Sequence, residues 1–379
     1  ISVEAGIGKT RLVEEFKRRS LAGAVESALP IYWLTGRCYE PEARTPYTMW
    51  ADALNALATA DWKSRLSGLP DVWLQQLARL TPDLAPLARN IEGASMTESQ
   101  LRLFQGIVQS LAYLAKSCCL ILFFDDLHWV DEASLELLHY VVRHLAESPL
   151  LIIGAYRPEM AVDHPSLEHL SRSTGDAASP SSLKLPSLDL ETVSHLLTHL
   201  GTELPRDFPD RLYQHSEGNP FFLVETLRTL FASGKLRREP NGRLVGLDEG
   251  VWPVPARVQD LIQARLSTLG EEHRRVVAAA AVIGRPFGLH LARRVSGLPE
   301  LQVLRIVEQL LDRAFLVEKD ESLPQQVLDF QHNYFRRAIY DGLKAVQRQT
   351  FHRRAAKALL ALHRARPGTV TEEIAYHYE

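Results

Sequence analysis

The feature that most constrains the fold is a glycine-rich run, EAGIGKT, at residues 4–10. Its two glycines let the backbone approach an anion with no Cβ in the way, so that successive N–H groups can point inward. Lys9 can then reach phosphate oxygens, and the hydroxyl of Thr10 can ligate magnesium. Residues 11–19 (RLVEEFKRR) predict a helix whose N-terminal dipole faces the bound phosphates. The run therefore predicts a loop that wraps nucleotide phosphates.

One position departs from the pattern G-x-x-x-x-G-K-[ST], because Val3 stands where the first glycine is expected. Valine is stiff at χ1 and resists positive φ, so the turn into the loop should differ. The donors that follow do not depend on Val3, and we expect binding to survive. The alternative on this run alone is a chance glycine-rich turn before a helix. The residues predicted to contact nucleotide here are Glu4, Ala5, Gly6, Ile7, Gly8, Lys9, Thr10 and Arg11.

A second run, LILFFDDLHWVDE, occupies residues 120–132. Its first five residues are continuously apolar, as expected of a strand covered on both faces. Asp125 and Asp126 follow at the carboxyl end of that strand, where open α/β sheets bind their ligands. We expect Asp125 to hold Mg²⁺, directly or through water, and Asp126 to orient and deprotonate the attacking water.

Asp126 is one methylene shorter than glutamate, so its reach is poorer and we predict slow turnover. The alternative is that the two acids only start a loop, and the upstream phosphate loop outweighs it. For two further residues of the run, the sequence predicts a structural role. Trp129 should pack in the core, and Asp131 should cap the helix that follows.

Strand-like and helix-like stretches alternate through the first half of the chain. The predicted strands are residues 31–38, 120–124, 150–156 and 183–185, and the predicted helices include residues 134–144 and a long region over 46–114 broken at prolines. Alternation of this kind predicts an α/β fold with a parallel sheet. In the second half, helical periodicity dominates, and Asn241-Gly242 between strand-compatible residues indicates a hairpin.

The composition limits the classes of protein to which this chain can belong. The apolar content of 46% and charged content of 23% are ordinary for globular chains, and 379 residues suggest two or three domains. The net charge of −3 gives no overall reason to bind nucleic acid or membrane. No apolar run approaches the ~18 residues that span a bilayer, and three cysteines form neither a disulfide framework nor a zinc site. We expect a cytoplasmic protein. Residues 1–3 are too short for the strand that should feed the loop, so we also expect a fragment.

Four segments together carry a family resemblance: EAGIGKTRL, FFDDLHWVDEASLELLHYVVRHL, LLIIGAYRPE and EGNPFFLVETLRTL. They resemble the STAND-type regulatory ATPases of bacteria, which belong to the AAA-related P-loop class near its origin-recognition-complex-like branch. Residues 254–287 resemble the arm of large SARP/BTAD and LuxR-type transcriptional regulators, and the same core occurs fused to nucleotide cyclase and protein kinase domains. The resemblance implies a three-layer P-loop NTPase core, a helical lid, a winged-helix domain and the start of a helical repeat array.

The resemblance also implies roles for three residues outside the two runs. Arg157, directly after the LLIIGAY strand, is similar to the arginine that senses the γ-phosphate; the alternative is a surface loop residue. Gly218-Asn219-Pro220 is similar to the motif whose proline packs near adenine in the lid. The alternative is a helix stop and restart, since Pro220 suits the first turn of a helix, and both can be true. His332 is similar to the winged-helix histidine that touches the ADP β-phosphate; the alternative is a structural histidine.

The expected domains are an ATPase core over residues 1–187, a lid over 188–250, a winged-helix region over 251–344 and the start of a tetratricopeptide-like array over 345–379. A helix is expected over residues 302–313, followed by strands at 315–317 and 326–330, which is the order of a winged helix. This candidate recognition helix carries Arg305 and Arg313 against Glu308 and Asp312, whereas a groove-reading helix should be strongly basic. We therefore expect no direct DNA binding. The array is the expected site for an inducer or partner protein, and self-association that depends on ATP is a further expectation.

Three functional hypotheses follow. The favoured one is an ATP-binding, slowly ATP-hydrolysing switch in a bacterial regulator, with the nucleotide between core and lid and with ATP and ADP favouring different arrangements. The second is a DNA-handling AAA machine that acts through its winged helix. The third is a metabolic P-loop phosphotransferase, for which the sequence offers no acceptor site.

Overall fold

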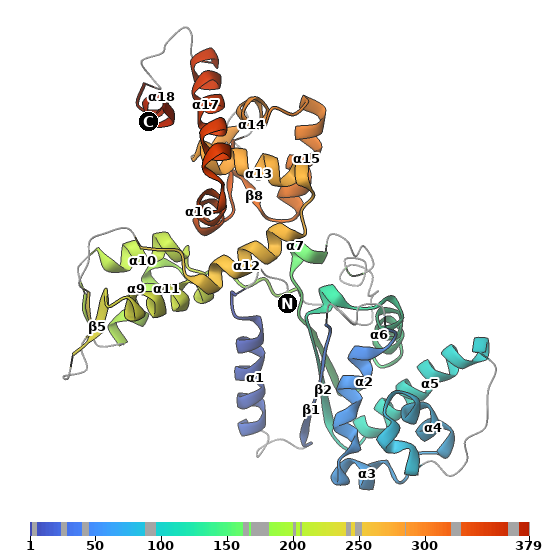
Figure 1. Cartoon of the computed structure of the whole chain (residues 1–379). Helices are drawn as coiled ribbons and strands as arrows, with labels where there is room; N and C mark the ends of the chain where they lie inside the picture. Colours follow the sequence, from blue (N-terminus) through green and yellow to red (C-terminus); the bar gives the residue numbers. More distant parts are fainter. Residues whose placement is uncertain are drawn as a thin grey trace. The chain divides into compact units, whose positions relative to one another are not determined.

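The computed structural model divides the chain into two compact units, Ile1–Pro186 (unit 1) and Ser187–Glu379 (unit 2). Figure 1 shows the elements of both units along the chain. The finer domain boundaries expected from the sequence within unit 2 stay predictions. The residues that the structure describes are 1, 6–23, 29–39, 45–87, 96–161, 167, 182–199, 202–204, 207–239, 244–246, 252–284, 286–319, 327–362 and 371–378.

Unit 1 is built on a parallel sheet whose described strands are β1 (Ile31–Arg37), β2 (Cys119–Asp125) and β3 (Leu150–Gly154), in the order β1-β2-β3. These are the strands expected at residues 31–38, 120–124 and 150–156, within two residues at each end. Residues 183–185, expected as a last strand, form none; Lys184 makes only an isolated bridge. A three-residue segment such as residues 183–185 cannot by itself specify a strand, because its pairing partner decides the outcome.

The register of the sheet places two charged residues side by side at the ends of β1 and β2. Arg37, the last residue of β1, lies beside Asp125, the last residue of β2. The main chain of Ile1 also pairs with this sheet, since its nitrogen donates to the carbonyl of Gly154 (2.6 Å) and its carbonyl accepts from the N–H of Tyr156 (3.1 Å). Ile1 therefore lies beside the end of β3.

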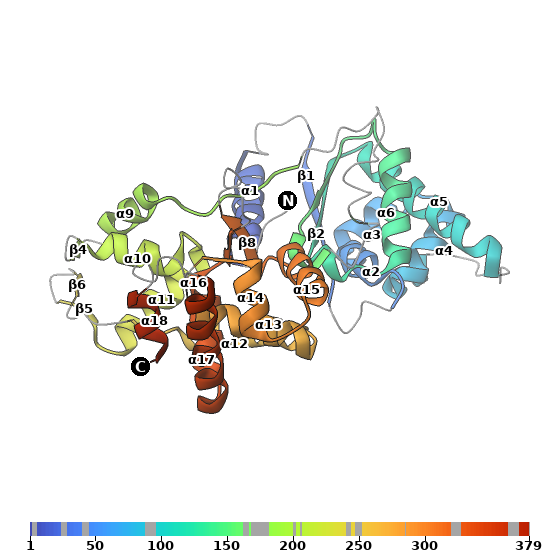
Figure 2. The same cartoon turned by 90° about the horizontal axis from the view of Figure 1, so that it is seen from above.

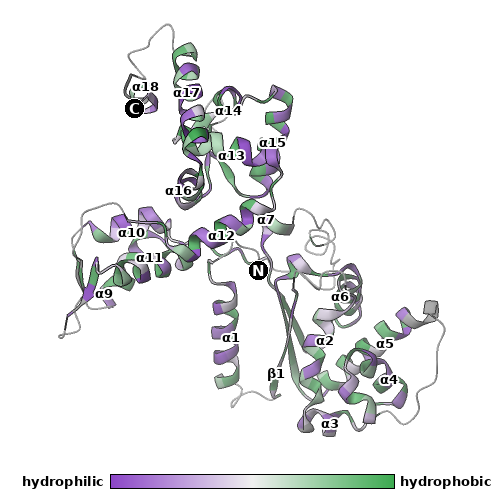
Figure 3. Cartoon of the chain, in the orientation of Figure 1, coloured by the Kyte–Doolittle hydropathy of each residue, from purple (hydrophilic) through white to green (hydrophobic). Residues whose placement is uncertain are grey.

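Helices cover both faces of this sheet and make three layers. In Figures 1 and 2, α1 (Lys9–Gly23) lies on one face, and α2 (Thr48–Asn55), α5 (Met96–Ala115) and α6 (Glu132–His144) lie on the other. In Figure 3 the central strands are coloured hydrophobic, whereas α1 alternates along its length. The remaining helical elements of unit 1 are η3 (Ala56–Ala58), α3 (Ala60–Leu66), α4 (Asp71–Leu80), η4 (Pro82–Leu87), η5 (Leu127–Trp129) and α7 (Pro158–Ala161).

Alternate side chains of β2 enter two separate cores, as the period of two in a strand requires. Leu122 and Phe124 are fully buried in a large cluster with Trp50 of α2, whereas Phe123 packs on the other face against Val13 of α1. This explains why β2 is apolar at every position before Asp125. Trp129 packs at the edge of the large cluster, as expected.

Asp131 begins α6 as the sequence predicts. Its Oδ1 accepts the N–H of Ser134 (2.8 Å), and its Oδ2 accepts the hydroxyl of the same residue (2.5 Å). Oδ1 also accepts the N–H of Tyr47 (3.2 Å), which ties the entry to α2 to this cap. The cap thus fixes the loop that follows the two aspartates of β2.

Unit 2 begins with α9 (Leu190–His199), α10 (Phe208–Ser216) and α11 (Pro220–Ala232), with a small sheet in the order β4-β6-β5. The pair β5–β6 is antiparallel, as the predicted hairpin requires, although Asn241-Gly242 lies outside the described residues. The strands of this sheet are β4 (Thr202–Glu203), β5 (Leu236–Arg238) and β6 (Leu244–Gly246).

The rest of unit 2 surrounds α13 (Glu271–Ile283), whose last eight residues are all buried. Alanines in this stretch let neighbouring helices approach closely. Helix–strand–strand order appears where the sequence predicts it, in α15, β8 and β9, and the winged-helix assignment itself stays a prediction. The elements are α12 (Ala256–Ser267), β7 (Phe287–Gly288), α14 (Leu289–Ser296), α15 (Glu300–Asp312), β8 (Leu316–Lys319), β9 (Val327–Phe330), α16 (Asn333–Gly342), α17 (Ala345–Leu362) and α18 (Thr371–Tyr378).

Among the described helices, none is both long and apolar enough to cross a bilayer.

Gly36 generates a stability prediction, because a Cβ placed there would lie 2.2 Å from the carbonyl oxygen of Met49 in α2. Gly36→Ala should force β1 and α2 apart and lower the free energy of unfolding by about 3 kcal/mol. Denaturant unfolding of the whole chain measures this change. Gly23→Ala is the matched control, since no atom lies within 4 Å of a Cβ at that position. Equal stability of the two variants would contradict the close packing of β1 on α2.

Candidate functional site

The glycine-rich loop of unit 1 uses backbone conformations that favour glycine. Gly6 has φ 86° and Gly8 has φ 111°, both in the left-handed half of φ space. A Cβ at Gly8 would meet open space, so the requirement for glycine there is the dihedral angle and not the packing. α1 begins directly after Gly8, and the N–H of Leu12 donates to the carbonyl of Gly8 at 2.9 Å. The N–H groups that precede Leu12 in this first turn have no acceptor within the helix, which is the arrangement that binds anions. Glu4 and Ala5, predicted to contribute donors, lie outside the described residues.

Lys9, the first residue of α1, is buried, with 7% of its surface exposed. Burial lowers the pKa of Lys9 from its ordinary value and nearby Arg157 lowers it further, while the acids Glu159, Asp126 and Asp125 oppose the shift. The ammonium group therefore sits where added negative charge stabilises it. A phosphate is the natural ligand for such a group at a helix N-terminus.

Thr10 links the loop to the sheet. Its Oγ1 donates to Oδ2 of Asp125 at 3.1 Å, across 115 residues of sequence. Ile7 of the loop is buried in the core. By contrast, the side chain of Arg11 is 79% exposed and lies 3.6 Å from Glu14, so it points away from the loop into solvent. Any contact of Arg11 with nucleotide would use its main chain.

Asp125 is almost fully buried, with 2% of its surface exposed. Besides the Thr10 hydroxyl, its Oδ2 accepts a hydrogen bond from Nη2 of Arg37 at 3.3 Å. Its Oδ1 accepts the N–H of Asp126 at 3.0 Å. Three donors therefore hold this carboxylate in one orientation at the end of β2.

Asp126 lies in the left-handed region, with φ 56° and ψ 40°, which is uncommon for a residue other than glycine. This conformation turns its side chain away from the path of β2. Oδ1 lies 4.0 Å from Nη2 of Arg157 and 3.9 Å from Nε2 of His128. Burial raises the pKa of Asp126, the charge of Asp125 raises it further, and Arg157, Arg37 and Lys9 act against the rise.

Arg157 directly follows the sheet, and its side chain is 33% exposed. The adjacent helix α7 brings a further acid to the site, because Glu159 is buried at 6% exposure and contributes to the charge around Lys9. Within the described ranges, Nε of Arg157 and Oε2 of Glu159 are buried with no hydrogen-bond partner. Such unsatisfied buried atoms mark a place where a bound polar group would be stabilised.

Sequence reasoning missed Arg37 and Glu159. Each stands beside the end of a predicted strand, in TGRC and in YRPE. Charged residues at the carboxyl ends of parallel strands could have identified both as candidates. The pairing register that brings Arg37 beside Asp125 is a property of the fold and is not readable from either segment.

The oxygen donors at this edge suit magnesium. Thr10 Oγ1 and a buried carboxylate oxygen of Asp125 lie 3.1 Å apart, and both are hard ligands of the kind that Mg²⁺ prefers. In the part of the chain that the structure describes, no group of three or more His, Cys, Asp or Glu residues could hold a metal ion. Magnesium usually needs no such cage, because phosphates and water supply most of its ligands.

Pro220 and His332, the other predicted nucleotide contacts, both lie in unit 2. Asn219 caps α11 by accepting the N–H groups of Phe221 (3.0 Å) and Phe222 (3.4 Å), and Pro220 occupies the first turn. The structural alternative for Pro220 is therefore correct, and it leaves the nucleotide role as a prediction.

His332 is buried, with 6% of its surface exposed. Its Nδ1 lies 2.6 Å from Oε2 of Glu217, and Oε1 of the same carboxylate accepts the N–H of Asn333 (3.0 Å). Glu217 directly precedes Gly218-Asn219-Pro220. The predicted lid motif and the predicted histidine are thus joined by one carboxylate that the sequence did not single out.

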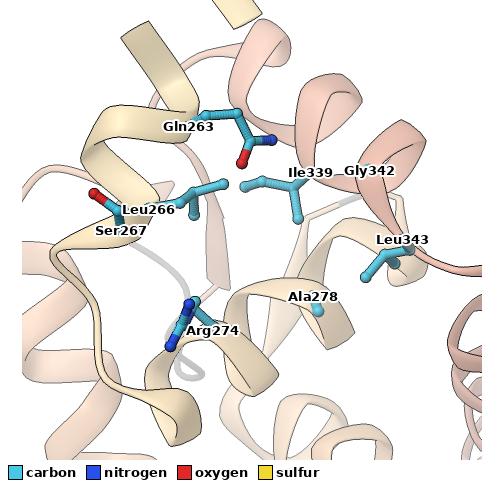
Figure 4. A pocket seen from close by; sticks show the side chains of 8 residues that line it. All are labelled: Gln263, Leu266, Ser267, Arg274, Ala278, Ile339, Gly342 and Leu343. Atoms are coloured by element: carbon cyan, nitrogen blue, oxygen red, sulfur yellow. The ribbon is translucent and has the colours of Figure 1, made fainter. Parts of the chain in front are cut away.

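Unit 2 also contains a hollow of about 220 Å³ between α12, α13 and α16. Figure 4 shows Leu266 and Ile339 pointing toward one another across it, with Gln263 and Arg274 at its edge. It contains none of the predicted site residues, and its largely apolar lining differs from the charged edge of the unit 1 sheet.

Comparisons with known proteins agree with the geometry of unit 1. Residues 1–153 match the family described as an AAA ATPase domain. An uncharacterized protein of Rhizobium meliloti (strain 1021) is 26% identical over 410 residues, which cover 99% of this chain and 37% of that protein. The chain thus spans little more than a third of the length of this relative.

Solved structures that match this chain include a STAND protein with a tetratricopeptide repeat sensor from Pyrococcus horikoshii, at 15% identity, covering 94% of this chain and 42% of that one, with a TM-score of 0.30. Drosophila ORC bound to DNA is 13% identical, with 91% and 90% covered and a TM-score of 0.31. Scores this low carry no argument. The family match, the left-handed glycines and the bond from Thr10 to Asp125 lead to one conclusion: unit 1 carries a P-loop ATPase domain of the AAA class, as the sequence predicts.

Proposed function

We propose that this chain is the ATPase module of a STAND-type regulatory switch, which binds ATP with magnesium, hydrolyses it slowly and changes state with the bound nucleotide. The observation that carries the proposal is the 3.1 Å hydrogen bond from Thr10 to Asp125, because it joins the phosphate loop to the acidic end of β2. A chance glycine-rich turn has no reason to meet a buried carboxylate in this way.

Binding would rest on the loop and α1. The N–H groups at the start of α1 and the ammonium of Lys9 would face the β- and γ-phosphates. Thr10 and Asp125 would hold magnesium, which would neutralise part of the phosphate charge. Burial of Lys9 strengthens its attraction to phosphate, because the local dielectric is lower than that of water.

Hydrolysis would use Asp126 and Arg157. Asp126 would accept a proton from the attacking water, and its raised pKa makes it a better base than an ordinary aspartate. Arg157, 4.0 Å from the Asp126 carboxylate, would contact the γ-phosphate and thereby report its presence. The short side chain of Asp126 favours slow turnover, which suits a switch.

The switch role would involve unit 2. A change of state needs contacts that differ between ATP and ADP, and His332 is the candidate for contact with ADP. Its pairing with Glu217 would link that contact to the start of α11. The paired helices α17 and α18 would begin the array that takes an inducer or partner protein. The exposed charges of α15 include Arg305 and Glu308, and this balance does not favour DNA as a partner.

The role of Lys9 gives the first prediction from this proposal. Lys9→Ala should weaken ATP affinity by about 100-fold or more, since a charge-assisted contact to phosphate is worth roughly 3 kcal/mol. Calorimetric titration of ATP with magnesium measures the change. Lys17→Ala is the control, because Lys17 lies on the same helix with its ammonium 5.7 Å from the Trp33 ring. If both variants bind ATP like the wild type, the proposed site is wrong.

The role of Asp126 gives a prediction in two parts. Asp126→Asn should preserve ATP affinity within about threefold and slow single-turnover hydrolysis by about 100-fold, which is typical for loss of a general base. In the wild type the rate should fall as pH falls through the raised pKa of Asp126, because protonation removes the base. Asp126→Asn should lack this acidic limb. Hydrolysis at the wild-type rate in the variant would refute the assignment.

The switch itself can be tested at His332. His332→Ala should weaken ADP affinity by about tenfold and leave ATP affinity nearly unchanged, because the histidine is assigned to one nucleotide state only. Competition titrations with both nucleotides measure the ratio. His290→Ala, at an exposed position of α14, is the control. Equal loss for ATP and ADP would show that His332 does not discriminate between the two states.

A further inference from the structure

Arg37 occupies an unusual position relative to the metal carboxylate of unit 1. It is the last residue of β1, and its register partner on β2 is Asp125. Nη2 of Arg37 lies 3.3 Å from Oδ2 of Asp125. The same oxygen accepts the hydroxyl of Thr10 at 3.1 Å. Arg37 and Thr10 therefore both donate to Oδ2 of Asp125, which is the oxygen that we expect to bind magnesium.

The backbone of Arg37 is fixed while its side chain reaches into solvent. Its N–H donates to Oδ2 of Asp52 in α2 at 2.9 Å, and the preceding Gly36 packs so tightly on Met49 that no Cβ fits. The side chain of Arg37 is nevertheless 45% exposed, against 3% for Asp125. The guanidinium can thus leave the carboxylate by rotation of its own side chain, with no movement of the strand.

The contact of Arg37 with Asp125 places a positive charge beside a buried negative one. A buried carboxylate without a counter-charge is costly, because it loses its hydration. The hydroxyl of Thr10 and the N–H of Asp126 compensate only with dipoles. Arg37 supplies a full positive charge at Asp125, and magnesium at the same oxygen would supply that charge in its place. Two cations within hydrogen-bond distance of one oxygen repel each other, so the two arrangements compete.

We propose that Arg37 is a built-in counter-cation for Asp125, which magnesium displaces, and that this exchange sets the magnesium dependence of nucleotide binding. The proposal rests on the proposed function for its nucleotide part and on the Asp125 contact alone for its metal part. Without metal, Arg37 keeps the Asp125 carboxylate from repelling the phosphates. With metal, the guanidinium is released toward solvent and its charge is no longer needed at the carboxylate.

The first experiment compares ATP affinity in excess EDTA with affinity in saturating magnesium, for the wild type and for Arg37→Gln. The variant should bind about tenfold more weakly in EDTA and within about twofold of the wild type in magnesium, so that the ratio of the two affinities rises about tenfold. Arg37→Lys should fall between them, because it keeps the charge but loses the planar guanidinium. An unchanged ratio, or an equal loss in both buffers, overturns the proposal.

Arg18→Gln is the matched control, since Arg18 also pairs with a carboxylate, Glu15 at 2.6 Å, but on the exposed face of α1. It should leave both affinities unchanged. Circular dichroism and the thermal midpoint of each variant show whether it is folded. If Arg37→Gln does not fold, the same comparison is made with Arg37→Lys, and an unchanged ratio there overturns the proposal.

The second experiment needs no nucleotide, so it separates this inference from the proposed function. Manganese serves as a paramagnetic probe for magnesium, and its binding to the nucleotide-free chain is measured by electron paramagnetic resonance. Arg37→Gln should bind manganese about tenfold more tightly than the wild type, because the competing cation is gone. Equal manganese affinity overturns the counter-cation role. A wild type that binds no ATP in either buffer refutes the proposed function, and the manganese comparison still decides the role of Arg37.

Discussion

The hydrogen bond between Thr10 and Asp125 is the interaction on which the site depends. It connects the first turn of α1 with the end of β2, although 115 residues separate them in the sequence. Secondary structure sets the position of both partners. α1 begins directly after Gly8, which has a positive φ, and β2 ends at Asp125 because the next residue, Asp126, also has a positive φ. The sheet therefore serves as the rigid support on which a glycine-rich loop is positioned. Without this bond, the loop and the acidic edge would be two unrelated features.

The two adjacent aspartates differ because their surroundings differ. Asp125 is buried and accepts hydrogen bonds from three donors, so its carboxylate is held in one orientation at the end of β2. Asp126, turned out by its positive φ, is partly exposed and has longer contacts, at about 4 Å, with Arg157 and His128. Burial and the neighbouring carboxylate raise its pKa. One acid thus suits a metal and the other suits proton transfer, and the strained backbone of Asp126 is what separates the two environments.

Much of unit 1 could be predicted from local sequence. The continuous apolar run of β2 predicts a strand buried on both faces, and the structure places its alternate side chains in two separate cores. Asp131 acts as the helix cap that its position suggests, because capping depends on only three or four residues. The roles of Arg37 and Glu159 could not be predicted in this way. Arg37 meets Asp125 through pairing of strands that lie 88 residues apart, and no local pattern encodes that register.

Gly218-Asn219-Pro220 of unit 2, predicted to be a lid motif, shows that a sequence signature and a structural role need not exclude each other. Glu217 and Gly218 both have positive φ, 50° and 72°, and together they end α10 and reverse the chain into α11. Gly218 is required twice, because a Cβ there would also lie 1.8 Å from the carbonyl of Leu188. This sharp reversal directs the Glu217 carboxylate at His332 and at the N–H of Asn333. A carboxylate that hydrogen-bonds one ring nitrogen of a histidine fixes the orientation of that ring. The junction that ends α10 and begins α11 therefore also fixes the position of His332.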